Sequence, residues 1–110
     1  MNKEEKKKFA TEFTNFININ FEFIKSMYKL FNTGETNLIL NDKEVNIKSE
    51  NFEKKDDTVF TTLLYAYMSM KQLKSPHDEM ITLNDDEIIE LYNYVEYVKK
   101  NCDIKAKFEN

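Results

Sequence analysis

The sequence predicts a small, mainly α domain of the α+β type, with three helices and one β-hairpin between the first and second of them. Apolar residues recur every three or four positions in three long segments, which is typical of amphipathic helices. One short segment instead carries apolar residues on both sides of a polar turn, as hairpins do. The length of 110 residues fits one domain. We therefore expect a single domain, residues 1–110, with helices at 3–32, 57–74 and 84–102 and a hairpin at 37–48.

The first predicted helix, residues 3–32, contains a stretch that could also be a strand. The segment ININFEF, residues 17–23, alternates apolar and polar side chains, which is a strand pattern. Over the whole window, however, apolar residues fall at spacings of three and four, opposite a polar stripe. These residues are Ala10, Phe13, Ile17, Phe21, Ile24, Tyr28 and Phe31. The longer pattern favours one helix, which we expect Gly34 to end because glycine adopts the left-handed conformation cheaply.

The apolar face of this first helix is unusually wide. Further apolar residues extend it on both sides, namely Phe9, Phe16, Phe23, Met27 and Leu30. Such a face is larger than one small domain can cover. We therefore expect the helix to pack on more than one neighbour and the chain to form a homo-oligomer.

The segment from 37 to 48 predicts a hairpin because apolar pairs flank the polar turn Asn41-Asp42. An isolated hairpin is only marginally stable in water, so it should lie against the helices. A polar connector follows, and the next helix, 57–74, is expected to end before Pro76. Its apolar face consists of Val59, Phe60, Leu63, Ala66, Tyr67 and Met70.

The last predicted helix, 84–102, has the clearest start. We expect Asn84 to be the N-cap and Glu87, three residues later, to complete a capping box. Acids in the first turn and lysines in the last suit the helix macrodipole. The predicted core face is Ile88, Leu91, Tyr92, Val95 and Val98. The tail DIKAKFEN, residues 103–110, is expected to fray.

Composition limits the classes of partner and location. The net charge is −4 and all sixteen basic residues are lysines, which disfavours nucleic-acid binding because phosphate recognition needs concentrated positive charge and often arginine. A single cysteine provides no disulfide framework and suggests a reducing interior. No stretch has the continuous apolar character of a secretion signal or a membrane span. We expect no membrane association.

The stretch from Ser75 to Val98 carries seven acids and no lysine, which raises the question of a carboxylate site. Two-carboxylate catalysis and metal binding both need groups that converge in a cleft. The first-turn acids are already explained by helix capping, and a calcium loop would need a glycine that this stretch lacks. We expect His77 to be a solvated loop residue and Cys102 to act as a small core hydrophobe. The sequence therefore predicts no catalytic, cofactor-binding or metal-binding residue.

The faces that point away from the predicted core suggest protein contacts instead. On the last helix, Glu87, Glu90, Tyr94 and Tyr97 recur at spacings of three, four and three. Tyrosine is common in interfaces because it offers amphipathic contact area. On the preceding helix, two more residues point off the main face, Tyr65 and Met68. These six residues are the predicted partner-binding set; a solvated helix face or buried oligomer contacts would explain them equally well.

A family resemblance covers residues 37–108. The segment MITLNDDEIIELYNYVEYVKKNCDIKAKF follows a hairpin and a helix, contains the dipeptide Thr82-Leu83, and ends its capped helix at Cys102. In this order of elements it resembles a small uncharacterised domain at the C-terminal ends of bacteriophage tail-fibre and tail-assembly proteins. That domain often has a tryptophan before the TL pair, where this chain has SPHDEM, and residues 1–32 have no counterpart in it.

The resemblance implies a non-enzymatic, tail-associated structural or assembly role, in the host cytoplasm or the virion, with no catalytic residues to carry over. The small size and acidity of the chain also fit a different class, a phage-encoded inhibitor of a host defence protein, similar to anti-CRISPR proteins. An enzyme is the third and least favoured class.

Overall fold

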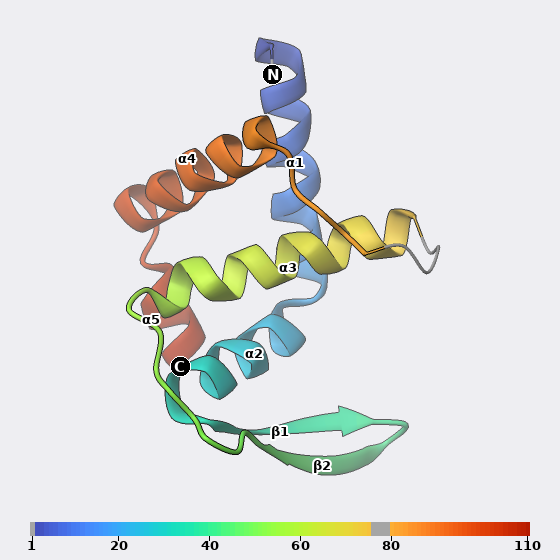
Figure 1. The fold of residues 1–110 in the computed structure, drawn as a ribbon, viewed down its shortest axis with the longest axis vertical. Coiled ribbons are helices and arrows are strands. Elements are labelled where there is room, and N and C mark those ends of the chain that lie inside the picture. The colour runs from blue at the N-terminus through green and yellow to red at the C-terminus, as the bar shows by residue number, and fades with distance from the viewer. Residues whose placement is uncertain (1, 76–79) are drawn as a thin grey trace.

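The computed structural model describes residues 2–75 and 80–110. Over these residues the chain is mainly helical, with one two-stranded antiparallel sheet, so the predicted fold class is confirmed (Figure 1). The elements follow in the order α1 (Lys3–Ile19), α2 (Phe21–Thr33), β1 (Glu35–Leu40), β2 (Lys43–Lys48), α3 (Thr58–Lys74), α4 (Asp85–Asn101) and α5 (Ile104–Glu109). The predicted number of three helices is wrong, since the described residues form five, and the hairpin lies between the second and third.

A break at Asn20 divides the predicted first helix into α1 and α2. The Asn20 backbone leaves the helical conformation, with φ −107° and ψ 25°, and its side-chain amide donates to the carbonyl of Phe16 at 3.0 Å. Short polar side chains compete in this way with the helical hydrogen bonds of the backbone. The same residue ends one helix and begins the next, so α2 leaves in a new direction (Figure 1).

The break changes how the wide apolar face is covered. Both halves bury residues in the same core, Phe9, Phe13 and Ile17 from α1 and Ile24 and Tyr28 from α2. Two of the side chains that widened the face, Phe16 and Met27, also pack against that core, as does Phe21 of the main stripe. Much of the surface on which we based the expected homo-oligomer is therefore covered within the chain, and the oligomer stays a prediction.

The centre of the molecule is α3, which crosses between the other helices and contacts α1, α2 and α4 (Figure 1). Asp57 caps its start by accepting a hydrogen bond from the Phe60 amide at 2.9 Å. Leu63 and Ala66 in the middle of the helix are fully buried. The helix ends at Lys74, in agreement with the predicted range, whereas Pro76 lies outside the described residues.

The hairpin packs on α2, as predicted. Its strands pair from Glu35 with Lys48 to Leu40 with Lys43, and both turn residues have positive φ, as a two-residue type I′ turn requires. Thr36 of β1 is buried beneath α2. Gly34 joins α2 to β1 with φ 80°, where a Cβ atom would also lie 2.7 Å from the ring of Phe52.

The tail does not fray, and the prediction that it would is wrong. Residues Ile104–Glu109 form α5, which Asp103 caps by accepting from the Ala106 amide at 3.1 Å. Phe108 is buried and stacks on Tyr28 with ring centroids 5.0 Å apart. Ile104 and Phe108, four positions apart, are both buried and thus anchor a helix that is too short to be stable alone.

No helix within the described ranges has the length and apolar character needed to cross a membrane.

Candidate binding groove between α1 and α4

Helix α4 begins where the sequence predicts but buries a different face. Asn84 accepts from the Glu87 amide at 2.9 Å and Glu87 accepts from the Asn84 amide at 3.1 Å, which completes the capping box. Of the predicted core face, Leu91 and Val95 are buried and Val98 packs partly against the core, whereas Ile88 and Tyr92 are 42% and 55% exposed. At 100° per residue, the buried face is rotated by about 50° from the predicted one.

The rotation brings Tyr94 inward. Its ring lies 5.0 Å from that of Phe13 and 6.1 Å from that of Phe9, and its hydroxyl shares a hydrogen bond of 2.9 Å with Thr14. A tyrosine whose ring and hydroxyl both find partners is a better core residue than one that must bury an unpaired hydroxyl. Burial raises the pKa of Tyr94, and the bond to Thr14 opposes that rise in part. Tyr94 is therefore chiefly a packing residue.

Glu87 is also occupied inside the molecule. Besides its capping bond, its carboxylate accepts from the Tyr67 hydroxyl at 2.9 Å and from the Lys71 ammonium at 2.5 Å, both on α3. Burial alone would raise the pKa of Glu87, but hydrogen bonds from Lys71, the Asn84 backbone and Tyr67 outweigh it and lower the pKa below its usual value. Glu87 thus fixes the start of α4 to α3.

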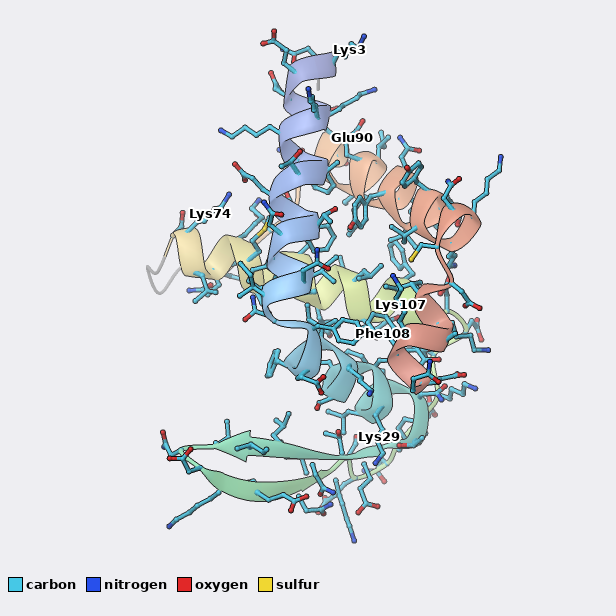
Figure 2. The ribbon with its side chains drawn as sticks, turned by 180° about the vertical axis from the view of Figure 1, so that it is seen from behind. Lys3, Lys29, Lys74, Glu90, Lys107 and Phe108 are labelled. Carbon is cyan, nitrogen blue, oxygen red and sulfur yellow. The ribbon has the colours of Figure 1, made fainter. Side chains whose placement is uncertain are left out.

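The other two predicted residues of α4 lie beside α1. The Glu90 side chain, labelled beside α1 in Figure 2, is 11% exposed and pairs with the Lys6 ammonium at 3.4 Å. Tyr97, two turns further along, is 65% exposed. Glu87, Glu90 and Tyr94 each make a side-chain contact described above that holds the fold together, whereas the Tyr97 side chain is mostly exposed.

Glu90, Tyr94 and Tyr97 line a single groove between α1 and α4, with a volume of about 470 Å³. Leu63 of α3, which is fully buried, lies at its floor, and α5 lies at the end opposite Glu90. Lys107 lies at that α5 end (Figure 2). The apolar lining comes from three helices besides α4 and includes Phe9, Ala10, Ile17, Leu63 and Ile104.

The predicted residues on α3 do not belong to this groove. Tyr65 is half-exposed and its ring lies 5.1 Å from that of Phe31 on α2, while Met68 is partly buried. The six predicted residues therefore divide into three that line the groove, one that ties α4 to α3, and two on the α3 surface. The α1 wall of the groove was missed, because only the opposite charges of Lys6 and Glu90 hint in the sequence that these helices meet.

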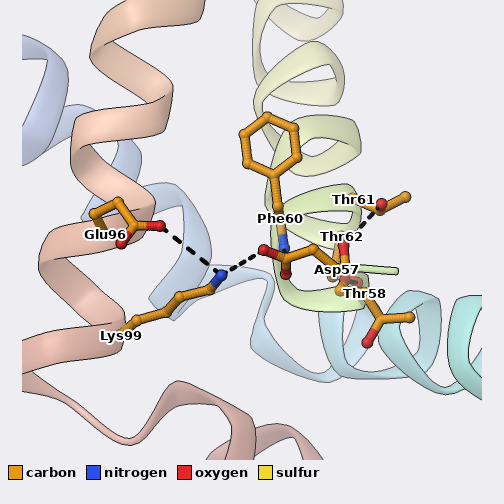
Figure 3. Close-up of polar contacts among 7 residues, drawn as sticks. All are labelled: Asp57, Thr58, Phe60, Thr61, Thr62, Glu96 and Lys99. Atoms are coloured by element: carbon orange, nitrogen blue, oxygen red, sulfur yellow. Dashed lines mark hydrogen bonds and ion pairs between the residues drawn. The ribbon is translucent and has the colours of Figure 1, made fainter. Parts of the chain in front are cut away.

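One further polar cluster joins α3 to α4. Lys99 near the end of α4 pairs with Asp57, the N-cap of α3, and lies 4.0 Å from Glu96 (Figure 3). Burial would raise the pKa of Asp57, but Lys99 and the Phe60 amide lower it below its usual value. This pair joins the start of α3 to the end of α4.

Among the described residues, the other candidate groups from the sequence do not form an assembled site. Cys102 is half-buried and lines the groove, whereas His77, Asp78 and Glu79 lie outside the described residues. In the described part of the chain, no three histidine, cysteine, aspartate or glutamate side chains are placed to hold a metal ion. A second cavity of about 490 Å³, between α2, β1 and α5, is lined mostly by polar side chains.

No protein-family model matches the chain, and neither does any curated protein or solved structure.

Proposed function

We propose that this protein is a non-enzymatic interaction module that binds a protein partner in the groove between α1 and α4. The observation that carries the proposal is an apolar groove with an exposed tyrosine, Tyr97, on its rim. Grooves of this kind receive the apolar face of an amphipathic helix, and tyrosines are enriched where such partners bind. Lys107 at the α5 end favours a helix that carries an acidic side chain at the matching end.

The polar groups of the groove support a protein partner more than a small substrate. Sites for small molecules usually direct several polar groups toward the ligand. Here the hydroxyls of Thr14 and Tyr94 are bonded to each other, and the Glu90 carboxylate is paired with Lys6. Asn18, Asn93 and Lys107 also line the groove, but its surface is mainly apolar, which suits the apolar face of a helix.

The biological setting that we propose is a bacteriophage structural or assembly accessory protein, associated with the tail and acting in the host cytoplasm or the virion. It rests on the resemblance of residues 37–108 to phage tail domains. The alternative is an acidic phage-encoded inhibitor of a host defence protein. The exposed acids Asp85 and Glu96 on the outer side of α4 favour that alternative, because an inhibitor that mimics nucleic acid needs accessible negative charge. Self-association is part of the same proposal.

The test compares two tyrosines of α4 that are similarly exposed. Tyr97→Ala removes a groove residue, and Tyr92→Ala, on the other side of the helix, is its matched control. Tagged proteins are purified under native conditions from the source cells, and their partners are identified by mass spectrometry. We expect one protein, other than a second copy of this chain, that is retained by wild type and Tyr92→Ala and lost with Tyr97→Ala. A partner set that is the same for all three proteins would contradict the proposal.

The acidic alternative has its own variant. The double variant Asp85→Lys/Glu96→Lys reverses two exposed charges without changing a groove residue. If the chain is an inhibitor that binds through its negative charge, this variant should lose the partner, and the wild-type chain should bind the partner less tightly in high salt. Glu87→Lys and Tyr94→Ala are unsuitable, because both residues hold the fold together.

A further inference from the structure

The outer side of α4, away from the groove, carries exposed apolar residues. Ile88, Ile89 and Tyr92 are 42%, 55% and 55% exposed and lie within about 100° of one another around the helix. The Tyr92 ring also contacts that of Phe60 at the start of α3, with centroids 4.8 Å apart. This outer stripe of α4 is therefore a continuous apolar surface that reaches onto α3.

The two ends of the stripe have opposite charge. Asp85, in the first turn, lies seven positions before Tyr92, and Lys100, in the last turn, lies eight positions after it. At 100° of rotation per residue, Asp85 and Lys100 lie on the same side of the helix as Ile89. Glu96 is also on this side and lies 4.0 Å from Lys99 of its own helix. A rotation of 180° about an axis near Tyr92 would thus place acid over base at both ends.

We infer that a second copy of this chain covers the outer stripe, with the two α4 helices packed antiparallel about a two-fold axis near Tyr92. The inference rests on the self-association in the proposed function and gives it a surface. A two-fold interface must be complementary to itself, and a stripe with an apolar centre, an acidic start and a basic end meets that condition. Antiparallel packing also sets the positive end of each helix dipole beside the negative end of the other.

The position of the axis is tested by cross-linking. Tyr92→Cys and Tyr97→Cys are each made in a Cys102→Ser background and treated with a short bismaleimide. Because two Tyr92 positions meet at the axis, we expect Tyr92→Cys to give a covalent dimer at least about tenfold faster than Tyr97→Cys, owing to its higher effective concentration. Equal rates for the two variants, or no dimer with either, would overturn the inference.

The charge pattern is tested by reversal and rescue. Asp85→Lys and Lys100→Glu should each raise the dimer dissociation constant roughly three- to tenfold, because each places like charges opposite each other twice in the dimer. The double variant Asp85→Lys/Lys100→Glu should restore the wild-type constant, measured by analytical ultracentrifugation. Reversing both ends opposes the α4 dipole most strongly, so a mere folding defect would be worst in the double variant, and that result would refute the inference.

Dimerisation and partner binding in the groove can be tested independently. Tyr97→Ala should leave the dissociation constant of the dimer unchanged, and Ile89→Lys should raise it at least about tenfold while circular dichroism shows an intact fold. A wild-type chain that stays monomeric at about 100 μM would reject the dimer and leave partner binding in the groove to be decided by its own test.

Discussion

Replacing Glu87 with glutamine tests whether its carboxylate holds α4 to α3. The substitution keeps the shape of the side chain and removes the negative charge of the carboxylate, which accepts hydrogen bonds from Lys71 at 2.5 Å and from Tyr67 at 2.9 Å. Hydrogen bonds to charged groups contribute about 1.5–3 kcal/mol each, and glutamine retains part of the network, so we expect a loss of about 1–2 kcal/mol at pH 7. For a domain of this size, that lowers the midpoint of thermal unfolding by roughly 4–10 °C.

The effect of Glu87→Gln should depend on pH in a defined direction. The pKa of Glu87 is lowered from its usual value of 4.5, so its stabilising contribution is complete above that value and is lost as the pH falls through the lower pKa of the folded state. The difference between wild type and variant should therefore be full at pH 7 and should shrink as the pH falls below 4.5.

The assay is thermal unfolding followed by circular dichroism at several pH values. Glu96→Gln is the control, because it changes a more exposed glutamate on the same helix and should alter stability by less than about 0.5 kcal/mol. If Glu87→Gln melts with the wild type at pH 7, or if its deficit is unchanged in acid, then the carboxylate does not anchor α4 as we describe.

Three further substitutions test the packing by urea denaturation. Tyr94→Phe should cost about 0.5–1.5 kcal/mol by leaving Thr14 without its 2.9 Å partner, and a variant as stable as wild type would show that this bond contributes nothing. Gly34→Ala should cost more than about 1 kcal/mol, since its φ is 80° and the new Cβ would meet Phe52; a stabilised variant would contradict this. Phe108→Ala should cost about 3–5 kcal/mol and expose α5 to proteolysis, whereas an unchanged cleavage pattern would mean that the tail is not anchored there.

The elements predicted well are those that local chemistry specifies. The start of α4 follows from Asn84 and Glu87, which are three positions apart, and the hairpin turn follows from two residues that tolerate positive φ. The hairpin range was short by only two residues at its start. No distant partner is needed to form either signal, so the sequence alone carries them.

The errors concern features that depend on distant residues. The 50° rotation of α4 is decided by Tyr94, whose partners Phe13 and Thr14 are about eighty positions earlier in the chain. The periodicity of α4 alone favours Ile88 and Tyr92 as core residues. Such a pattern counts every apolar side chain alike, so it does not show that Tyr94 has a partner for its hydroxyl and is buried in their place. The groove was likewise only half predicted, since its α1 wall is a product of tertiary packing.

The Asn20 break places local and global preferences in conflict within one segment. Residues 3–33 have the periodicity of one helix, and Asn20 is the single residue between α1 and α2. Freed from the rest of the chain, this segment has little reason to bend, because the core that rewards the bend is absent. The Asn20 side chain therefore makes the bend possible, and packing of α1 and α2 in one core selects it.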